Sequence, residues 1–175
     1  MNIKRIVVGP LQTNCYLLVK DNNCLVVDPG DDYNLIKEVI GSLNLLGVLI
    51  THRHYDHIGA LGYLVDEYKV MVYDKAMGKG HHNIESFSFD IIENNGHSDD
   101  SITFYFKEDD VMFCGDFLFK GTIGRTDLPT GSDEEMLQSL KEIKKYPYDT
   151  IIYPGHGSAS NLGYEFENNF CFKDI

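Results

Sequence analysis

The sequence THRHYDH at residues 51–57 decides how this chain is interpreted. The apolar run GVLIT at 47–51 predicts a short strand before it, and the helical spacing of apolar residues from Ile58 to Val65 predicts a helix after it. The stretch therefore forms a loop at the end of a strand. Three imidazoles and a carboxylate in six residues suit a borderline ion such as zinc, whereas the alternative is a solvated, histidine-rich surface loop. The four residues concerned are His52, His54, Asp56 and His57.

Three further candidates also fall at the ends of predicted strands. His97 follows Asn95-Gly96 and precedes the run ITFYF at 102–106, Asp116 follows VMFCG at 111–115, and His156 follows TIIYPG at 150–155. Taken singly, each is typical of an ordinary turn or surface residue. Together with THRHYDH they supply two sets of ligands and one bridging carboxylate, which is what a two-metal hydrolase needs. The pair His81-His82 lies in a predicted loop, and we expect it not to bind metal.

The composition predicts one globular domain over residues 1–175, without a linker or repeat. The net charge of −12 argues against nucleic acid and anionic membranes as partners. The start of the chain has Pro10 and Gln12 where a signal peptide needs an apolar stretch, so we expect a cytoplasmic protein. Its cysteines form no CxxC pair and are expected to be small buried apolar residues. They are Cys15, Cys24, Cys114 and Cys171.

The remaining patterns predict an α/β protein with sheets packed face to face and helices outside. A helix is expected over 31–45, and Ser132 with Glu135 predicts a capping box at the start of another. Periodicity leaves the topology open. Further strands are expected at 4–9, 14–20, 23–28 and 69–73.

Eight segments resemble one known family, the metallo-β-lactamase superfamily, and within it the short glyoxalase II-like (hydroxyacylglutathione hydrolase-like) branch. They are TNCYLL, LVVDPG, THRHYDH, GHSDDS, CGDFLF, IGRTDLPTGS, YPGHG and NLGYEFENNF, and they span nearly the whole chain. The resemblance implies a four-layer αβ/βα sandwich with metals at one edge, between the two sheets.

The resemblance also implies how the candidate residues divide. His52, His54 and His97 hold the first metal. Asp56, His57 and His156 hold the second, and Asp116 bridges the two. Asp28 matches an acidic residue that steadies the THRHYDH loop without binding metal, although an ordinary Asp-Pro-Gly turn would look the same. The cofactors implied are two divalent ions, with Zn favoured and Fe or Mn as alternatives.

The function expected is hydrolysis of a small thioester. A water molecule bound between two divalent ions loses a proton near pH 7, and Asp56 and Asp116 would orient it. The alternative is a sulfur dioxygenase of the same superfamily that uses one iron and oxidises persulfides. A β-lactamase is disfavoured because His or Cys usually replaces the residue that matches Asp116, and a non-catalytic binding module is disfavoured because all seven ligand candidates are present.

The chain departs from the branch in two places. It has GHSDDS where the branch usually has GHTPGS, so Asp99 and Asp100 stand beside a ligand candidate. They either raise the pKa of the metal-bound water and repel anionic substrates, or point into solvent as a turn and a cap. Glyoxalase II also carries a C-terminal helical domain that contacts glutathione. Because the sequence stops at Ile175, we expect weak selection of the thiol carrier and a high KM for glutathione thioesters. The sequence does not predict the oligomeric state.

Overall fold

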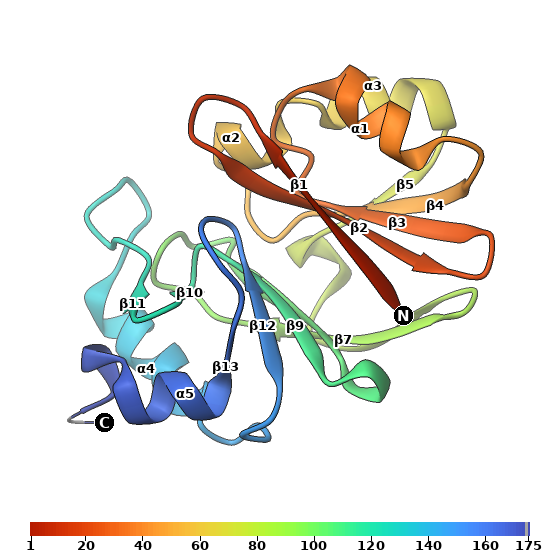
Figure 1. Ribbon diagram of the computed structural model, residues 1–175. Helices are drawn as coiled ribbons and strands as arrows, with labels where there is room; N and C mark the ends of the chain where they lie inside the picture. Colours follow the sequence, from red (N-terminus) through yellow and green to blue (C-terminus); the bar gives the residue numbers. More distant parts are fainter. Residues whose placement is uncertain (174) are drawn as a thin grey trace.

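The computed structural model describes residues 1–173 and residue 175. Its strands form two mixed sheets and one small hairpin. Figure 1 shows helices α1 and α3 outside the first sheet and helices α4 and α5 outside the second. The strands are β1 (Asn2–Val8), β2 (Thr13–Lys20), β3 (Asn23–Val27), β4 (Asn44–Leu49), β5 (Met71–Tyr73), β6 (Gly80–Ile84), β7 (Phe87–Glu93), β8 (Ile102–Phe106), β9 (Val111–Gly115), β10 (Leu118–Phe119), β11 (Thr122–Ile123), β12 (Ile151–Pro154) and β13 (Ser160–Asn161). The helices are α1 (Tyr33–Ile40), α2 (Tyr55–Ile58), α3 (Leu61–Tyr68), α4 (Asp133–Ile143) and α5 (Leu162–Asn168), with short 3-10 helices η1 (Lys75–Met77), η2 (Lys107–Asp109) and η3 (Phe170–Phe172).

The first sheet has the order β1-β2-β3-β4-β5. Strands β1, β2 and β3 form an antiparallel meander, whereas β4 and β5 run parallel to β3 because α1 and then α2 and α3 connect them. The alternation expected of a strand is clear in β2. Tyr16 and Leu18 face the second sheet, while Cys15 and Leu17 face the helices.

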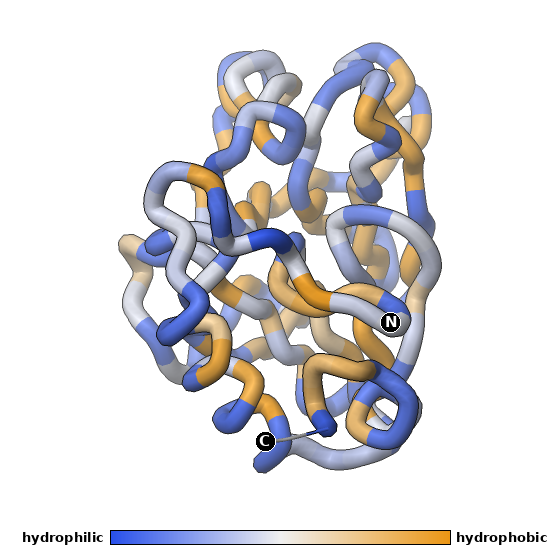
Figure 2. The backbone as a smooth tube through the Cα atoms, turned by 90° about the vertical axis from the view of Figure 1, so that its left-hand side faces the viewer, coloured by the Kyte–Doolittle hydropathy of each residue, from blue (hydrophilic) through white to orange (hydrophobic). Residues whose placement is uncertain are grey.

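The second sheet has the order β13-β12-β9-β8-β7-β6. Its pairs are antiparallel except for β12 with β9, which α4 connects. The ends of β4, β9 and β12 point to the same edge of the sandwich, where the loops that follow them meet. Hydrophilic stretches in Figure 2 lie mostly in the outer loops, and apolar stretches run through the middle.

Three apolar clusters explain the four layers. One lies between the sheets, with Tyr16 and Leu25 of the first packed against Phe104 and Phe113 of the second. Another joins the first sheet to α1 and α3, and the third joins the second sheet to α4 and α5. The expected αβ/βα sandwich is therefore confirmed, because each sheet buries both faces.

Several local predictions were wrong. The helix expected over 31–45 ends at Ile40, because Gly41 takes a positive φ of 57° and donates its N–H to Lys37, and residues 44–49 form β4. His81 and His82 lie in strand β6, which with β7 and α5 was not predicted.

Two side-chain predictions hold only in part. Ser132 accepts a hydrogen bond from the backbone N–H of Glu135 at 3.3 Å, but the Glu135 carboxylate accepts from Asn95 and does not complete the capping box. All four cysteines are free, and three are buried as expected, whereas Cys171 is partly exposed because it lies in the short η3 near the C-terminal end. Within residues 1–173 and 175, none of the helices has the length and apolarity needed to cross a membrane.

Candidate metal centre

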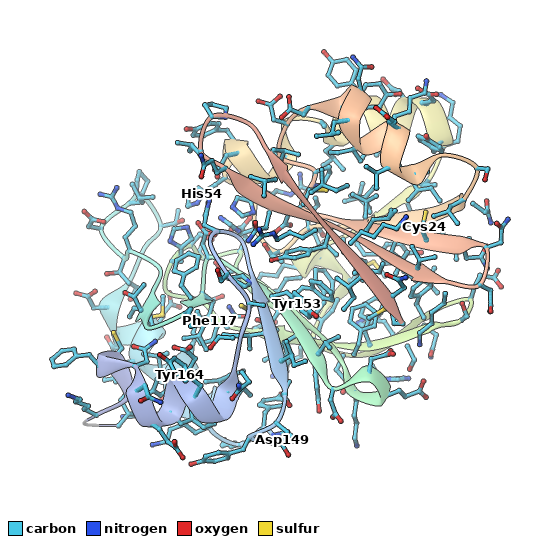
Figure 3. The ribbon with its side chains drawn as sticks, in the orientation of Figure 1. Cys24, His54, Phe117, Asp149, Tyr153 and Tyr164 are labelled. Atoms are coloured by element: carbon cyan, nitrogen blue, oxygen red, sulfur yellow. The ribbon has the colours of Figure 1, made fainter. Side chains whose placement is uncertain are left out.

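The predicted ligand residues meet at one edge of the sandwich, between the two halves of the molecule. His52 and His54 lie in the loop from β4 to α2, Asp56 and His57 lie in α2, and the others follow strands of the second sheet. Figure 3 places His54 at this junction, away from Cys24 in the first half. The candidate ligands therefore come from both halves of the fold.

Two glycines allow this close approach. A Cβ atom on Gly115, whose φ is 49°, would lie 2.3 Å from Thr51 Oγ1, and one on Gly155 would lie 2.2 Å from Asp116 Oδ1 and 2.6 Å from His57 Cε1. All three distances are shorter than van der Waals contact. Any larger residue here would therefore push the loops of the centre apart.

A first group consists of His52, His54 and His97, with one nitrogen of each within 4.8 Å of the others. The nitrogens of His54 (Nδ1) and His97 (Nε2) are 2.9 Å apart. His52 and His97 are buried, and His54 is half-buried at the surface of the centre. Imidazole nitrogens that converge in this way can hold a transition-metal ion.

A second group consists of Asp56, His57 and His156, which also lie within 4.8 Å of one another. Asp56 Oδ2 is 3.2 Å from His156 Nε2 and 3.5 Å from His57 Nε2. A carboxylate with two imidazoles is a second donor set that a divalent ion accepts.

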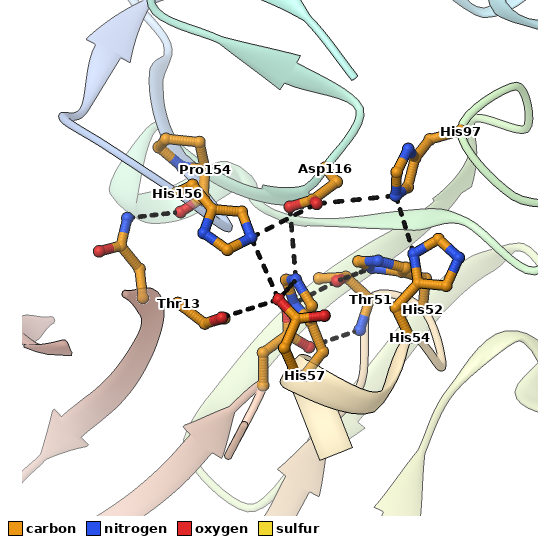
Figure 4. A network of polar contacts seen from close by, with 12 residues as sticks. Thr13, Thr51, His52, His54, His57, His97, Asp116, Pro154 and His156 are labelled. Atoms are coloured by element: carbon orange, nitrogen blue, oxygen red, sulfur yellow. Dashed lines mark hydrogen bonds and ion pairs between the residues drawn. The ribbon is translucent and has the colours of Figure 1, made fainter. Parts of the chain in front are cut away.

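Asp116 lies between the two groups (Figure 4). Its Oδ1 atom is 3.4 Å from His57 Nε2, and its Oδ2 atom is 3.6 Å from His97 Nε2 and 3.5 Å from His156 Nε2. This one carboxylate thus contacts histidines of both groups, which is the position expected of a bridging ligand.

The outer nitrogens of four histidines have partners of their own. His57 Nδ1 is 2.9 Å from Asp28 Oδ2, His97 Nδ1 is 2.8 Å from the Arg125 carbonyl, and His156 Nδ1 is 3.1 Å from the Leu11 carbonyl. Thr51 Oγ1 donates to Asp28 at 2.6 Å and lies 3.2 Å from His52 Nδ1. These acceptors favour a proton on Nδ1, which leaves the lone pair of Nε2 facing the centre.

The inner atoms fit a cation. His52 Nε2, His57 Nε2 and Asp116 Oδ1 are buried and have no hydrogen-bond partner among the described residues. Buried polar atoms are normally satisfied, so three that converge on one point indicate a ligand that binds lone pairs. A metal ion meets that requirement.

The electrostatics of the metal-free centre agree with this fit. Burial raises the pKa of Asp116, but contacts with His156 and His57 outweigh it and hold the pKa well below its usual range. Contacts with Asp116 and Asp56 raise the pKa of His156 to about 9. Burial lowers the pKa of His52, so its imidazole stays neutral. In the metal-free centre, protons thus supply part of the positive charge that a metal ion would supply.

Sequence reasoning gave no role to three buried residues at the start of β2. Thr13 Oγ1 donates to Asp56 Oδ2 at 2.8 Å. Asn14 Nδ2 donates to the carbonyls of Pro154 and Gly157, and the Tyr16 hydroxyl donates to the Pro154 carbonyl at 2.6 Å. They hold Asp56 and the His156 loop in place. The sequence signals were the segment TNCYLL of the family resemblance and a polar Thr-Asn pair at the start of an apolar strand.

His81 and His82 lie outside the groups described above. His81 Nδ1 is 2.9 Å from Asp90 Oδ1 across the β6–β7 pair, and His82 Nε2 is 2.9 Å from the Gly78 carbonyl. His81 is exposed to solvent. One ring nitrogen of each histidine therefore has a protein partner, which is a carboxylate of the neighbouring strand for His81 and a backbone carbonyl for His82.

A cavity of about 700 Å³ opens onto the centre. Leu11, Tyr55, Leu128 and Pro129 give it apolar walls, and Asp56, Asp116 and His156 reach it from the metal groups. A cleft of this size and mixed polarity suits a small organic substrate.

Comparison with known proteins agrees with the fold. The sequence matches the metallo-β-lactamase superfamily over residues 8–84 and 78–156, and the chain belongs to this superfamily. It is 33% identical to the probable metallo-hydrolase YqgX of Bacillus subtilis over 97% of this chain and 96% of that protein. It is also 33% identical to the hydroxyacylglutathione hydrolase GloC of Haemophilus influenzae over 97% of each. These relatives support a metal-dependent hydrolase as the class of activity.

Solved structures give the same result. The crystal structure of the BLEG-1 B3 metallo-β-lactamase has a TM-score of 0.94 and 29% identity, covering 98% of this chain and 100% of that chain. The crystal structure of TTHA1623 in a di-iron-bound form has a TM-score of 0.87 and 30% identity, covering 95% and 98%. The second of these proteins holds two metal ions on a fold similar to this one.

Proposed function

We propose that this protein is a dinuclear metal-dependent hydrolase of small thioesters. The observation that carries the proposal is the position of Asp116, whose two oxygens face His57 of the second group and His97 of the first. A carboxylate that faces both ligand groups is the bridging ligand that a two-metal hydrolase needs. We propose Zn as the ion, with Fe or Mn as alternatives, because imidazole and carboxylate ligands accept all three.

The two groups would hold one ion each, with Asp116 in contact with both. When bound, divalent ions at these positions polarise a carbonyl oxygen and lower the pKa of a water molecule. The residues of the chain position the reactants. Thr13 fixes the Asp56 carboxylate by a hydrogen bond, and Asp116 stays ionised at neutral pH, so both can orient the attacking water.

The three buried cysteine thiols make poor nucleophiles. Burial raises the pKa of the Cys114 thiol to about 12 and that of Cys24 to about 11, and it also raises the pKa of Cys15. Thiols of this kind carry almost no thiolate at neutral pH. A water molecule is therefore the nucleophile that the centre favours.

A thioester is the substrate class that we favour. The cavity has apolar walls for an acyl group and opens to solvent, where a larger thiol carrier can extend. A thiol with a pKa near 8.5 also leaves as a thiolate without a strong general acid. GloC, which is named as a hydroxyacylglutathione hydrolase, supports this class among the relatives. Four free cysteines agree with the reducing cytoplasm, which we propose as its location.

The second candidate is a sulfur dioxygenase that uses one iron. Two histidines and one carboxylate are the usual ligands of a single non-haem iron, and His52, His57 and Asp116 form such a group, with one ligand atom of each within 4.8 Å of the others. The two candidates differ in stoichiometry and in co-substrate, since a dioxygenase consumes O2 and a hydrolase does not.

The test is metal analysis of protein purified without chelator, together with a panel of substrates. The panel contains S-lactoylglutathione, a neutral acyl thioester, glutathione persulfide in an oxygen electrode, and a chromogenic cephalosporin, since BLEG-1 is described as a β-lactamase. We expect two equivalents of metal and hydrolysis of both thioesters. One equivalent of iron with oxygen uptake, or hydrolysis of the cephalosporin alone, would refute the proposal.

A further inference from the structure

Asp100 connects the loops that carry the first group. It lies between β7 and β8, three residues after His97. Its Oδ2 atom accepts a hydrogen bond at 2.9 Å from the backbone N–H of Arg53, the residue between His52 and His54. One carboxylate oxygen of the second half therefore holds the backbone that carries two first-group ligands.

The other oxygen of Asp100 holds the third ligand's own loop. The Ser98 hydroxyl donates to Asp100 Oδ1 at 2.7 Å, and Ser98 Oγ is also 2.7 Å from Ser101 Oγ. Ser98 directly follows His97 and is buried. Asp100 thus forms two hydrogen bonds, which we call its two arms, one to the Arg53 N–H and one to the Ser98 hydroxyl. Both partners are next to ligands of the first group in the sequence.

A second set of contacts reinforces the same junction from the outside. The Arg53 guanidinium pairs with Asp74 Oδ2 at 2.5 Å. Lys75 Nζ donates to Asn95 Oδ1 at 2.7 Å and to the Asp99 carbonyl at 2.5 Å. The segment after β5 is therefore tied both to the His52–His54 loop and to the His97 loop.

The second group is held by different residues. Thr13, Asn14 and Tyr16 contact Asp56 and the loop of His156 from the start of β2. A change at Asp100 therefore leaves these contacts intact. The two groups can be perturbed separately.

From this geometry we infer that Asp100 is a positioning residue for the first metal site. By binding the Arg53 N–H with one oxygen and the Ser98 hydroxyl with the other, it fixes the distance between His52 and His54 on one loop and His97 on the other. The inference rests on the proposed two-metal function and names a residue that acts through the ligands. It also replaces the expectation that Asp100 points into solvent.

Three substitutions separate hydrogen bonding from charge. Asp100→Ala removes both arms. Asp100→Asn removes the charge but can keep both arms, because the amide oxygen accepts from the Arg53 N–H and the amide N–H donates to Ser98 Oγ. Ser98→Ala removes one arm and leaves the other. Asp99→Asn is the matched control, since the exposed Asp99 touches its neighbours through backbone atoms.

The experiment is a Co²⁺ titration of the full metal-free chain, followed by its visible absorption. His54→Ala and His156→Ala provide reference spectra for loss of the first and the second group. For Asp100→Ala we expect about tenfold weaker binding of one equivalent, in the range found for outer partners of metal ligands, with a spectrum that approaches that of His54→Ala. Asp100→Asn and Asp99→Asn should bind within about threefold of the wild type, and Ser98→Ala should fall between.

The outcomes distinguish this inference from the proposed function. If the wild-type chain binds fewer than two Co²⁺ ions, the proposed function fails. If it binds two and Asp100→Ala binds both as tightly, or if Asp100→Asn is as weak as Asp100→Ala, the positioning role is refuted. Circular dichroism of the metal-free variants checks their folding, and Ser98→Ala still tests one arm should Asp100→Ala not fold.

Discussion

Asp28 is the residue whose replacement most sharply tests how the centre is built. It is 2% exposed and accepts three hydrogen bonds. Its Oδ1 atom accepts from the Thr51 N–H at 2.8 Å, and its Oδ2 atom accepts from Thr51 Oγ1 at 2.6 Å and His57 Nδ1 at 2.9 Å. The substitution Asp28→Asn keeps the size of the side chain. It also suits the backbone, since Asp28 has a φ of 48° and Asn tolerates this region well.

Asparagine cannot satisfy all three donors. With its NH2 group in place of Oδ1, two donors face each other at the Thr51 N–H. With the NH2 group in place of Oδ2, His57 Nδ1 must become an acceptor, so its proton moves to Nε2, the atom that faces the metal groups. Loss of such a partner weakens metal binding about 10- to 100-fold, or about 1.4–2.7 kcal/mol. The free energy of unfolding of the metal-free protein should fall by about 1.5–3 kcal/mol, because hydrogen bonds to a charged group are lost.

The assay is competition for Zn²⁺ against a chromophoric chelator, with urea unfolding of the metal-free protein in parallel. Asp21→Asn is the matched control, because Asp21 has a similar φ of 53° but is exposed in the β2–β3 turn. We expect the control to match the wild type in both measurements. If Asp28→Asn binds Zn²⁺ as tightly as the control, the idea that Asp28 sets the protonation of His57 is wrong.

Three further predictions follow from the same centre. Burial lowers the pKa of His57, but Asp28 and Asp116 outweigh it and raise that pKa to about 10, so His57 and His156 are both doubly protonated at neutral pH in the metal-free protein. Metal binding must release one proton from each, so the affinity should fall by up to about 100-fold per pH unit on acidification. A calorimetric binding enthalpy that is the same in all buffers would contradict this. Gly155→Ala should abolish tight metal binding because its Cβ would meet Asp116. The control is Gly62→Ala in α3, where nothing lies within 4 Å and the substitution should stabilise the fold by about 0.4–1 kcal/mol. Equal metal content in the two variants would contradict the prediction. Tyr16→Phe should lower the free energy of unfolding by about 0.5–1.5 kcal/mol, because the hydrogen bond from the Tyr16 hydroxyl to the Pro154 carbonyl is lost. Tyr148→Phe at an exposed site is the control, and equal stability of the two variants would count against a stabilising role of this hydrogen bond.

Much of this protein was determined by local sequence. Apolar periodicity predicted most strands and the helices α1, α3 and α4, since a side-chain period of two or of 3.6 residues follows directly from backbone geometry. The candidate ligands could be found because histidine and aspartate stand at strand ends, where loops converge. The end of α1 was missed because the apolar spacing continues past Gly41, whose positive φ stops the helix.

Only the tertiary structure decided which residues support the candidate ligands. Thr13 and Asp56 are 43 positions apart, Asn14 and Pro154 are 140 apart, and Arg53 meets Asp100 across 47 positions. No local pattern contains such pairs, because they depend on strand order and on how the two sheets pack. Hydrogen bonds are short and directional, so a role such as that of Asp100 exists only once the fold has brought donor and acceptor within about 3 Å.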